Sequence, residues 1–317
     1  MPSRIRILSI DGGGIRGVLT AALLDRIEAA RSGFLSKVFL FAGTSTGGIL
    51  ALGLAAGRAP SDMRDLYVTN ARDIFDDSIW DDLRDLGRLR GAEYGLKKLK
   101  RALVREFGDI TLRRLRPRHV LIPTFDLDNV DELSARDKAD PSKRHWKPKF
   151  FHNLAGSDSK DGAELVVDVA LRTSAAPTYF PSYQGYVDGG VVANNPAMAA
   201  LAQALDARGR NGGCKLEEIA LLSLGTGTSL EFVKGRRHDW GYAQWVKPLV
   251  RLILDGNMGV ADYQCRQILR DRYCRLAPIF PAGTVIQSDD IDRIPELLAF
   301  AAGVDLDPTL DWLDRNW

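Results

Sequence analysis

The chain has few cysteines and no long apolar run, and both scarcities limit what it can be. Its three cysteines, Cys214, Cys265 and Cys274, have no close spacing, which argues against a disulfide framework and against a zinc site. No apolar run approaches the roughly eighteen residues that a membrane-spanning helix needs, since the uncharged segment at 38–57 is interrupted by the sequence G-T-S-T-G-G at 43–48. The apolar segment at residues 5–10 is too short for a secretory signal. We therefore expect a cytoplasmic protein.

An excess of charge of one sign is missing as well. Lys and Arg number 43 against 41 Asp and Glu, a formal net charge of +2, so the chain is not built to bind a nucleic-acid polymer. Histidine is scarce, and His119, His145 and His152 lack the paired spacing of metal ligands. The remaining composition, 45% hydrophobic and 26% charged, is that of an ordinary globular protein with enough chain for a large core.

The N-terminal part of the chain alternates strand-like and helix-like segments. Apolar periodicity predicts strands at 4–10 and 38–42 and helices at 18–30 and 46–56. This alternation predicts an α/β fold with a parallel sheet and right-handed crossovers. Further strands are predicted at 119–125, 149–154, 184–187, 218–224 and 273–276, and further helices at 164–173, 196–207, 240–269, 294–302 and 308–317.

The domain organisation is inferred from the lack of repeats and linkers between these segments. No internal repeat and no Pro/Ser-rich linker divides the chain. We therefore expect one domain over residues 1–317, with a helical insertion near 60–110 and a mainly helical C-terminal region at 229–317.

A serine stands in a sharp strand-to-helix turn at residues 43–47, G-T-S-T-G. An apolar run precedes the turn and another follows it, so Ser45 has the setting of a nucleophile elbow. Gly43 and Gly47 suit a strained turn in which two backbone segments approach too closely for a Cβ. The following helix directs its N-terminal N–H groups toward an oxyanion formed beside Ser45. A plain turn between a strand and a helix is the alternative.

A glycine-rich loop follows the first predicted strand at residues 11–17, D-G-G-G-I-R-G. Gly12, Gly14 and Gly17 satisfy the dinucleotide-binding pattern G-x-G-x-x-G, so a nucleotide-binding module is a competing hypothesis. That site also needs an acidic residue at the end of the second strand, where this chain has A-G-T-S. Consecutive N–H groups at a helix start suit a tetrahedral oxyanion as well as a phosphate.

A third motif, D-G-G at residues 188–190, comes shortly before N-N-P at 194–196. Asn195 followed by Pro196 predicts a helix N-cap and a first helical position. The loop between the two motifs is therefore expected to be short and held at both ends. Asp-Gly is also the commonest signature of a simple turn, and taken alone Asp188 fits that interpretation as well.

In this order, the glycine loop, the serine elbow and the D-G-G block resemble the patatin-like phospholipase family. Residues 223–227, S-L-G-T-G, are similar to a strand-end signature that members also carry, and the resemblance covers residues 4–228. It implies a three-layer α/β/α sandwich around a mainly parallel sheet. It also implies a serine acyl hydrolase that cleaves glycerophospholipids, needs neither a metal nor an organic cofactor, and associates peripherally with the membrane surface when active.

The resemblance gives each motif residue a role. Ser45 would attack the ester carbonyl, and Asp188 would act as its general base without an intervening histidine. Water would then release the acyl group from the serine. Stabilisation of the oxyanion would come from the glycine loop, through Gly12, Gly13, Gly14 and Arg16.

Three alternatives stay open at this point. The enzyme could be a lysophospholipase or a general carboxylesterase, or the chain could be a non-catalytic nucleotide-binding module that uses the same glycine loop. A conventional triad of Ser45, Asp188 and His238 would follow the chain order of α/β-hydrolases. Against that triad, the α/β-hydrolase fold places several strands before its nucleophile, whereas Ser45 follows the second, and His238 lies in a polar segment.

Basic residues gather at 84–118 and at 136–149. In the first stretch Lys97, Lys98, Lys100 and Arg101 alternate with leucines, which is typical of a basic amphipathic helix on an anionic membrane or of a solvated face above a core stripe. We expect the insertion near 60–110 to be a lid or docking element.

A small anionic activator is a further expectation from the resemblance. Some bacterial members of the family are of similar size and are switched on by a cyclic nucleotide in anti-phage defence. Arg136, Arg144 and Trp146 in the second basic stretch are candidates for binding such an activator. A solvated surface loop is the competing interpretation of these residues, and no motif identifies the site.

Overall fold

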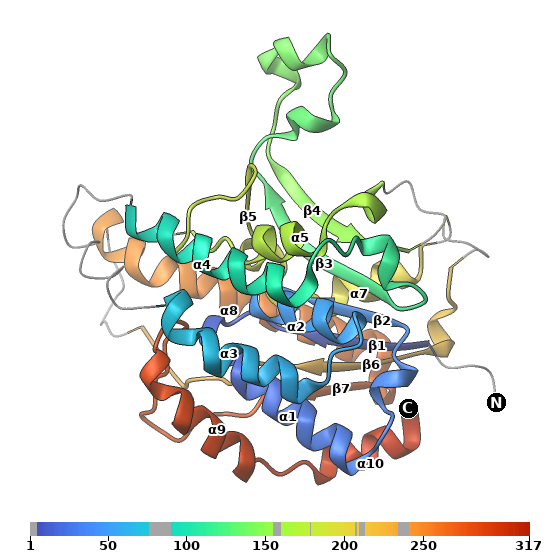
Figure 1. The fold of residues 1–317 in the computed structure, drawn as a ribbon. Helices are drawn as coiled ribbons and strands as arrows, with labels where there is room; N and C mark the ends of the chain where they lie inside the picture. Colours follow the sequence, from blue (N-terminus) through green and yellow to red (C-terminus); the bar gives the residue numbers. More distant parts are fainter. Residues whose placement is uncertain are drawn as a thin grey trace.

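The computed structural model describes residues 5–75, 90–154, 160–177, 179–206, 208, 213–233 and 241–317. Figure 1 shows a central sheet between two layers of helices, with an arm that projects from the body. The three-layer α/β/α sandwich predicted above is thereby confirmed.

The sheet of the described residues has seven strands in the order β4-β3-β2-β1-β6-β7, with β5 also paired to β3. The pairs among β3, β2, β1, β6 and β7 are parallel, and β4 and β5 run antiparallel to β3. The sheet is therefore mainly parallel, as predicted. The strands are β1 (Ile5–Ile10), β2 (Leu40–Gly43), β3 (His119–Asp126), β4 (Lys147–His152), β5 (Tyr186–Asp188), β6 (Ile219–Leu224) and β7 (Tyr273–Leu276).

Helices cover both faces of the sheet because its central strands are apolar on both sides. Ile7 of β1 belongs to one core cluster, whereas Leu8 and Ile10 belong to the other. The larger cluster lies under α1 (Gly17–Ala30), α2 (Thr46–Ala55), α3 (Pro60–Phe75), α4 (Arg90–Phe107), α5 (Val166–Thr173), α9 (Ile294–Gly303) and α10 (Asp307–Asn316). The smaller cluster lies under α7 (Ala197–Ala204) and α8 (Tyr242–Leu269).

The arm is the connection from β3 to β4, residues 127–146, and it is drawn in green at the top of Figure 1. It consists of short 3-10 turns rather than a regular hairpin. An ion pair between Arg144 and Asp128 joins its two ends, and a second pair joins Lys147 to Glu132.

Two local predictions on either side of β5 were wrong. Gln184 and Gly185, predicted to begin a strand, form a turn with positive φ values of 51° and 81°, so the strand starts at Tyr186. The segment expected to be a loop after the D-G-G motif contains a short helix, α6 (Gly190–Ala193). Four residues are too few for a helical apolar period to be visible in the sequence.

Candidate active site

Ser45 lies in a strained turn between β2 and α2. Its φ is 54° and its ψ is −124°, a conformation that a non-glycine residue adopts only where the surroundings force it. The two flanking glycines are required by close backbone contacts. A Cβ on Gly43 would lie 2.0 Å from the carbonyl oxygen of Gly47, and a Cβ on Gly47 would lie 2.3 Å from that of Ile10. Ser45 therefore sits at the start of α2 in the geometry of an elbow.

Hydrogen bonds from neighbouring elements hold this turn. The Ser45 N–H donates to Thr173 Oγ1 at 3.0 Å, and the Thr173 hydroxyl donates to the carbonyl of Pro123 at 2.6 Å. On the other side, the Thr44 hydroxyl donates to the carbonyl of Ala193 at 2.6 Å. The turn is thus tied to β3, to the end of α5 and to α6.

Asp188 ends β5 and is almost completely buried. The Ser45 hydroxyl donates to its carboxylate, and the N–H of Gly190 donates to Oδ1 at 2.7 Å. Burial raises the pKa of Asp188 to about 6, and the two hydrogen bonds only partly oppose that rise. At neutral pH the group is therefore an ionised carboxylate that is a stronger base than an exposed aspartate.

Asn257 of α8 fixes the helix that follows Asp188. Its Oδ1 accepts the N–H of Asn194 at 2.8 Å, and its Nδ2 donates to the carbonyl of Gly190 at 2.8 Å. One side chain thus contacts both ends of α6. Because α6 begins two residues after Asp188, this contact also limits movement of the aspartate.

Some N–H groups of the glycine loop donate hydrogen bonds to other segments of the protein, and two have no acceptor in the described structure. The N–H of Gly12 donates to the carbonyl of Asn194 at 3.0 Å, and that of Ile15 donates to the carbonyl of Ser288 at 2.7 Å. Within the part of the chain that the structure describes, the N–H groups of Gly13 and Gly14 have no acceptor. Two adjacent donors therefore remain for a ligand, and Gly12 contributes to the loop through its contact with Asn194 instead.

No side chain fits at the two donor residues. A Cβ on Gly13 would lie 2.2 Å from Thr226 Oγ1, and a Cβ on Gly14 would lie 2.0 Å from the carbonyl oxygen of Ser288. Gly14 also has a φ of +58°, which favours glycine.

Arg16 braces the same loop from a half-buried position. Its Nε donates to the carbonyl of Gly13 at 3.4 Å, and its Nη1 donates to that of Gly227 at 3.2 Å. Burial lowers the pKa of this guanidinium, which still leaves it charged at neutral pH. The Arg16 side chain therefore contacts carbonyl groups of the loop and also lines the cavity described next.

These residues border a single cavity of about 510 Å³, a volume typical of small-molecule sites. The structure brings Ser45, Asp188, Gly13 and Gly14 together on its wall. Much of the remaining lining is apolar and comprises Ile49, Leu99, Ala176, Pro177, Phe180, Val191, Leu254, Met258 and Ile286. The cavity can thus hold an apolar chain next to a serine, a carboxylate and two N–H donors.

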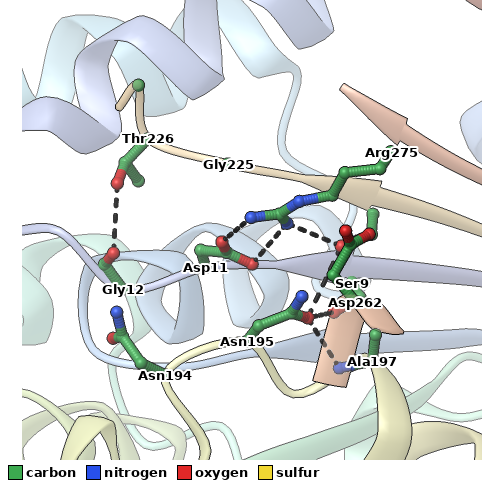
Figure 2. A network of polar contacts seen from close by, with 12 residues as sticks. Ser9, Asp11, Gly12, Asn194, Asn195, Ala197, Gly225, Thr226, Asp262 and Arg275 are labelled. Atoms are coloured by element: carbon green, nitrogen blue, oxygen red, sulfur yellow. Dashed lines mark hydrogen bonds and ion pairs between the residues drawn. The ribbon is translucent and has the colours of Figure 1, made fainter. Parts of the chain in front are cut away.

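A second polar network lies beneath the glycine loop (Figure 2). The guanidinium of Arg275 on β7 pairs with Asp11 and donates to Ser223 Oγ at 2.8 Å. Asn195 Oδ1 accepts the N–H of Ala197 at 3.0 Å and the hydroxyl of Ser9 at 3.4 Å. The network connects the ends of β1, β6 and β7 with the start of α7.

Several of the residues considered in the sequence lie elsewhere. His238 is outside the described residues. His119 packs its ring against that of Phe39, with centroids 4.7 Å apart. No three His, Cys, Asp or Glu side chains gather as a metal site within the described ranges. No helix in those ranges is both long and apolar enough to cross a bilayer.

The basic residues singled out in the sequence lie on α4 and in the arm. On α4, Lys97, Lys100 and Arg101 are exposed, whereas Leu99 and Leu103 are buried, so the helix is amphipathic. In the arm, Arg144 is paired with Asp128, and Trp146 is 72% exposed. Arg136 precedes one of the 3-10 turns of the arm.

Comparison with known proteins gives consistent matches. Residues 8–201 match a family model described as patatin-like phospholipase. The chain is 28% identical to Protein teg of Priestia megaterium and 29% identical to the putative sporulation hydrolase CotR of Bacillus subtilis, in each case over 99% of both chains. It is 34% identical to a cGAMP-activated phospholipase of Vibrio cholerae, over 71% of this chain and 65% of that one.

Proposed function

Because this chain belongs to the patatin-like phospholipase family and is therefore a hydrolase, we propose that it cleaves acyl esters of glycerophospholipids with Ser45 as nucleophile and Asp188 as general base. The observation that best supports the proposal is the hydrogen bond from the Ser45 hydroxyl to the buried Asp188 carboxylate. It occurs beside the N–H groups of Gly13 and Gly14, in a largely apolar cavity.

The reaction follows from this geometry. Asp188 accepts the proton of the Ser45 hydroxyl while Ser45 Oγ attacks the ester carbonyl. The carbonyl oxygen becomes an oxyanion, which the N–H groups of Gly13 and Gly14 and the N-terminus of α2 stabilise. Collapse of this intermediate breaks the ester bond, and the leaving alkoxide takes the proton from Asp188. Water repeats the sequence on the acyl-enzyme and regenerates Ser45.

The raised pKa of Asp188 suits this role. A general base is most effective when its pKa lies near the working pH, and about 6 is much closer to neutral than the ordinary value of 3.8. A histidine between the two residues is unnecessary in this scheme because Ser45 contacts the carboxylate directly.

Helices α4 and α8 both border the cavity, through Leu99 and through Leu254 and Met258. We assign the contact with the lipid surface to α8. Its exposed residues include an apolar series with helical spacing, namely Leu249, Leu252, Ile253, Val260 and Tyr263. The basic residues of α4 are the other candidate for this contact. They lie in the insertion near 60–110, which was expected to be a lid or docking element.

Covalent labelling tests the nucleophile. A fluorophosphonate should label the wild-type protein and fail to label the Ser45→Ala variant, while Ser36→Ala, at an exposed serine, should label normally. Asp188→Asn should fold and lose most labelling. Labelling that persists in Ser45→Ala contradicts the proposal. Absence of labelling in the wild-type protein contradicts it as well.

The substrate class needs a separate measurement. Lipid mass spectrometry of phospholipid vesicles exposed to wild type and to Ser45→Ala should show fatty acids and lysophospholipids from wild type only. Hydrolysis of lysophospholipids or simple esters without diacyl lipids would instead support the lysophospholipase or carboxylesterase alternative.

Activation by a cyclic nucleotide is part of the proposal because several relatives carry that property in their names. The candidate residues Arg136, Arg144 and Trp146 lie in the projecting arm. Vesicle hydrolysis should rise when cGAMP is added to the wild-type protein and should not rise in Arg136→Ala with Trp146→Ala. Hydrolysis that is independent of every cyclic di- and trinucleotide contradicts this part.

A further inference from the structure

A hydrogen bond to its carbonyl oxygen fixes the peptide unit between Gly12 and Gly13. The hydroxyl of Thr226 donates to the carbonyl oxygen of Gly12 at 3.1 Å, as Figure 2 shows. A trans peptide unit is planar, with its C=O and N–H pointing in opposite directions. The N–H of Gly13 belongs to this unit, so it points away from Thr226. Within the described structure, it is one of the two N–H groups of the glycine loop that have no acceptor.

The next peptide unit is held in the same way. The carbonyl of Gly13 accepts the backbone N–H of Arg16 at 3.2 Å and the Arg16 Nε at 3.4 Å. The N–H of Gly14, in the same unit, therefore points away from Arg16. Both open donors thus belong to peptide units whose carbonyl groups are fixed by hydrogen bonds on the opposite side.

Thr226 is itself held firmly. It is 2% exposed and follows β6, whose last residue accepts the N–H of Asp11 at 2.9 Å through the Leu224 carbonyl. The N–H of Gly225 donates to the carbonyl of Leu276 at 2.9 Å. The hydroxyl of Thr226 therefore reaches Gly12 from a segment bonded to strands on both sides.

We propose that Thr226 is a positioning residue for the oxyanion site: its hydroxyl sets the direction of the Gly13 N–H. This inference rests on the proposed acyl hydrolysis and gives a task to the segment 223–227, S-L-G-T-G, which the mechanism does not otherwise use. Without that hydroxyl the buried Gly12 carbonyl loses its partner, and the peptide unit can rotate toward another donor. The donor then no longer matches the place where charge develops.

The test compares Thr226→Val, which keeps the branched shape and removes the hydroxyl, with Thr226→Ser, which keeps the hydroxyl. On a soluble ester, Thr226→Val should lower kcat by about ten- to a hundredfold with KM nearly unchanged, since oxyanion donors act mainly in the transition state. Thr226→Ser should stay within about threefold of wild type. Thr226→Ala should behave like Thr226→Val, and it serves if the valine variant does not fold.

Thr20→Val is the matched control. The Thr20 hydroxyl also donates to a buried backbone carbonyl in this segment, that of Gly225 at 3.0 Å, but that carbonyl belongs to neither of the peptide units that carry the N–H groups of Gly13 and Gly14. Loss of this bond should reduce stability and leave kcat nearly unchanged. A kcat that falls equally in both valine variants would show a general packing effect and overturn the inference.

A trifluoromethyl ketone gives a second readout, because its adduct with serine places an oxyanion where the reaction does. Its affinity should fall in Thr226→Val by the same factor as kcat, whereas the affinity of an ether analogue of the substrate should not change. Equal kcat in wild type and Thr226→Val overturns the inference but leaves the proposed function intact. Hydrolysis by wild type that survives in Ser45→Ala overturns both.

Discussion

At the residue scale, the buried Asp188 carboxylate lowers the free energy of unfolding at neutral pH. Its pKa is about 6 in the folded chain against an ordinary value of 3.8. Between these two values the folded state holds a proton that the unfolded state has released. Stability therefore falls as pH rises through this window, and the full cost is present above pH 6.

The substitution Asp188→Asn should remove this cost because the side chain is then neutral at every pH. We expect the variant to match wild type near pH 4 and to exceed it by on the order of 2 kcal/mol at pH 7, with hydrolysis almost abolished. Urea unfolding at pH 4, 5, 6 and 7 measures the difference. Asp109→Asn, at an exposed aspartate, should follow wild type throughout. A constant difference between Asp188→Asn and wild type across this range would contradict the assignment.

Activity should also follow the ionisation of Asp188, but it should rise with pH where stability falls. As the proposed base, Asp188 can accept a proton only when ionised, so kcat/KM on a soluble ester should rise with pH through a midpoint near 6 and level off above it. A stopped assay from pH 4.5 to 8, with unfolding checked at each pH, provides the profile. Activity that is already maximal at pH 5 would show that this carboxyl group is not the base.

The parts of the site that the sequence predicted are those with a local signal. Ser45 and Asp188 were identifiable because each lies in a short glycine-flanked motif whose turn requires those glycines. Thr173, Thr226 and Asn257 act through contacts with residues more than sixty positions away. Threonine and asparagine are common on any surface, so nothing in their immediate neighbours indicated these roles.

At the scale of elements, α8 carries two kinds of apolar residue. Leu254 and Met258 line the cavity, whereas Leu252 and Ile253 are more than two-fifths exposed. A helix that lies at the cavity wall and also shows apolar side chains to solvent is suited to the boundary of a bilayer. Lipid leaving the membrane would then meet the cavity wall along the same helix.

Replacing Leu252 and Ile253 by Glu should weaken binding to vesicles of phosphatidylcholine and phosphatidylglycerol by about tenfold. Hydrolysis of a soluble ester should not change. Ile279→Glu, at another exposed apolar residue, is the control and should bind normally. Co-sedimentation with vesicles provides the measurement.

The same assay judges the alternative on α4. If Lys97, Lys98, Lys100 and Arg101 changed together to Gln abolish vesicle binding while the α8 variant binds as wild type does, the lipid contact belongs to α4. Salt distinguishes the two as well, because contacts between charges and anionic lipids weaken with ionic strength.

The predicted and observed helices and strands differ where contacts between distant parts of the chain determine the local backbone conformation. The alternating strands and helices of the N-terminal part were predicted because their apolar periods are strong, and β1, β2, α1 and α2 follow them closely. The four residues of α6 have no such period. They become helical where Asn257 bonds both ends of the segment, and that contact comes from a different part of the chain.

At the scale of the whole molecule, one ion pair joins strands distant in the sequence. Arg275 of β7 reaches Asp11 at the end of β1, past the intervening strand β6. The Asp11 side chain is 1% exposed and that of Arg275 is 11% exposed. Loss of one partner leaves the other charge buried without compensation, which costs more than the pair itself contributes.

The variant Arg275→Met should therefore lower the free energy of unfolding by about 3–5 kcal/mol. The double variant Arg275→Met with Asp11→Asn should recover part of that loss, since no uncompensated charge remains. Urea unfolding of wild type, Arg275→Met, Asp11→Asn and the double variant forms a double-mutant cycle, which measures the coupling between the two side chains. Additive losses in the double variant would contradict a direct interaction between the two side chains.

The carbonyl that accepts the N–H of Ile15, and leaves no room for a side chain on Gly14, belongs to Ser288. A ribosome makes the glycine loop, the serine and the aspartate long before it makes this residue. A growing chain therefore carries its proposed nucleophile and its proposed base while the loop still lacks the contact with Ser288. For the proposed phospholipid hydrolase, we expect this order of synthesis to delay hydrolysis until the segment around Ser288 has folded back onto the loop.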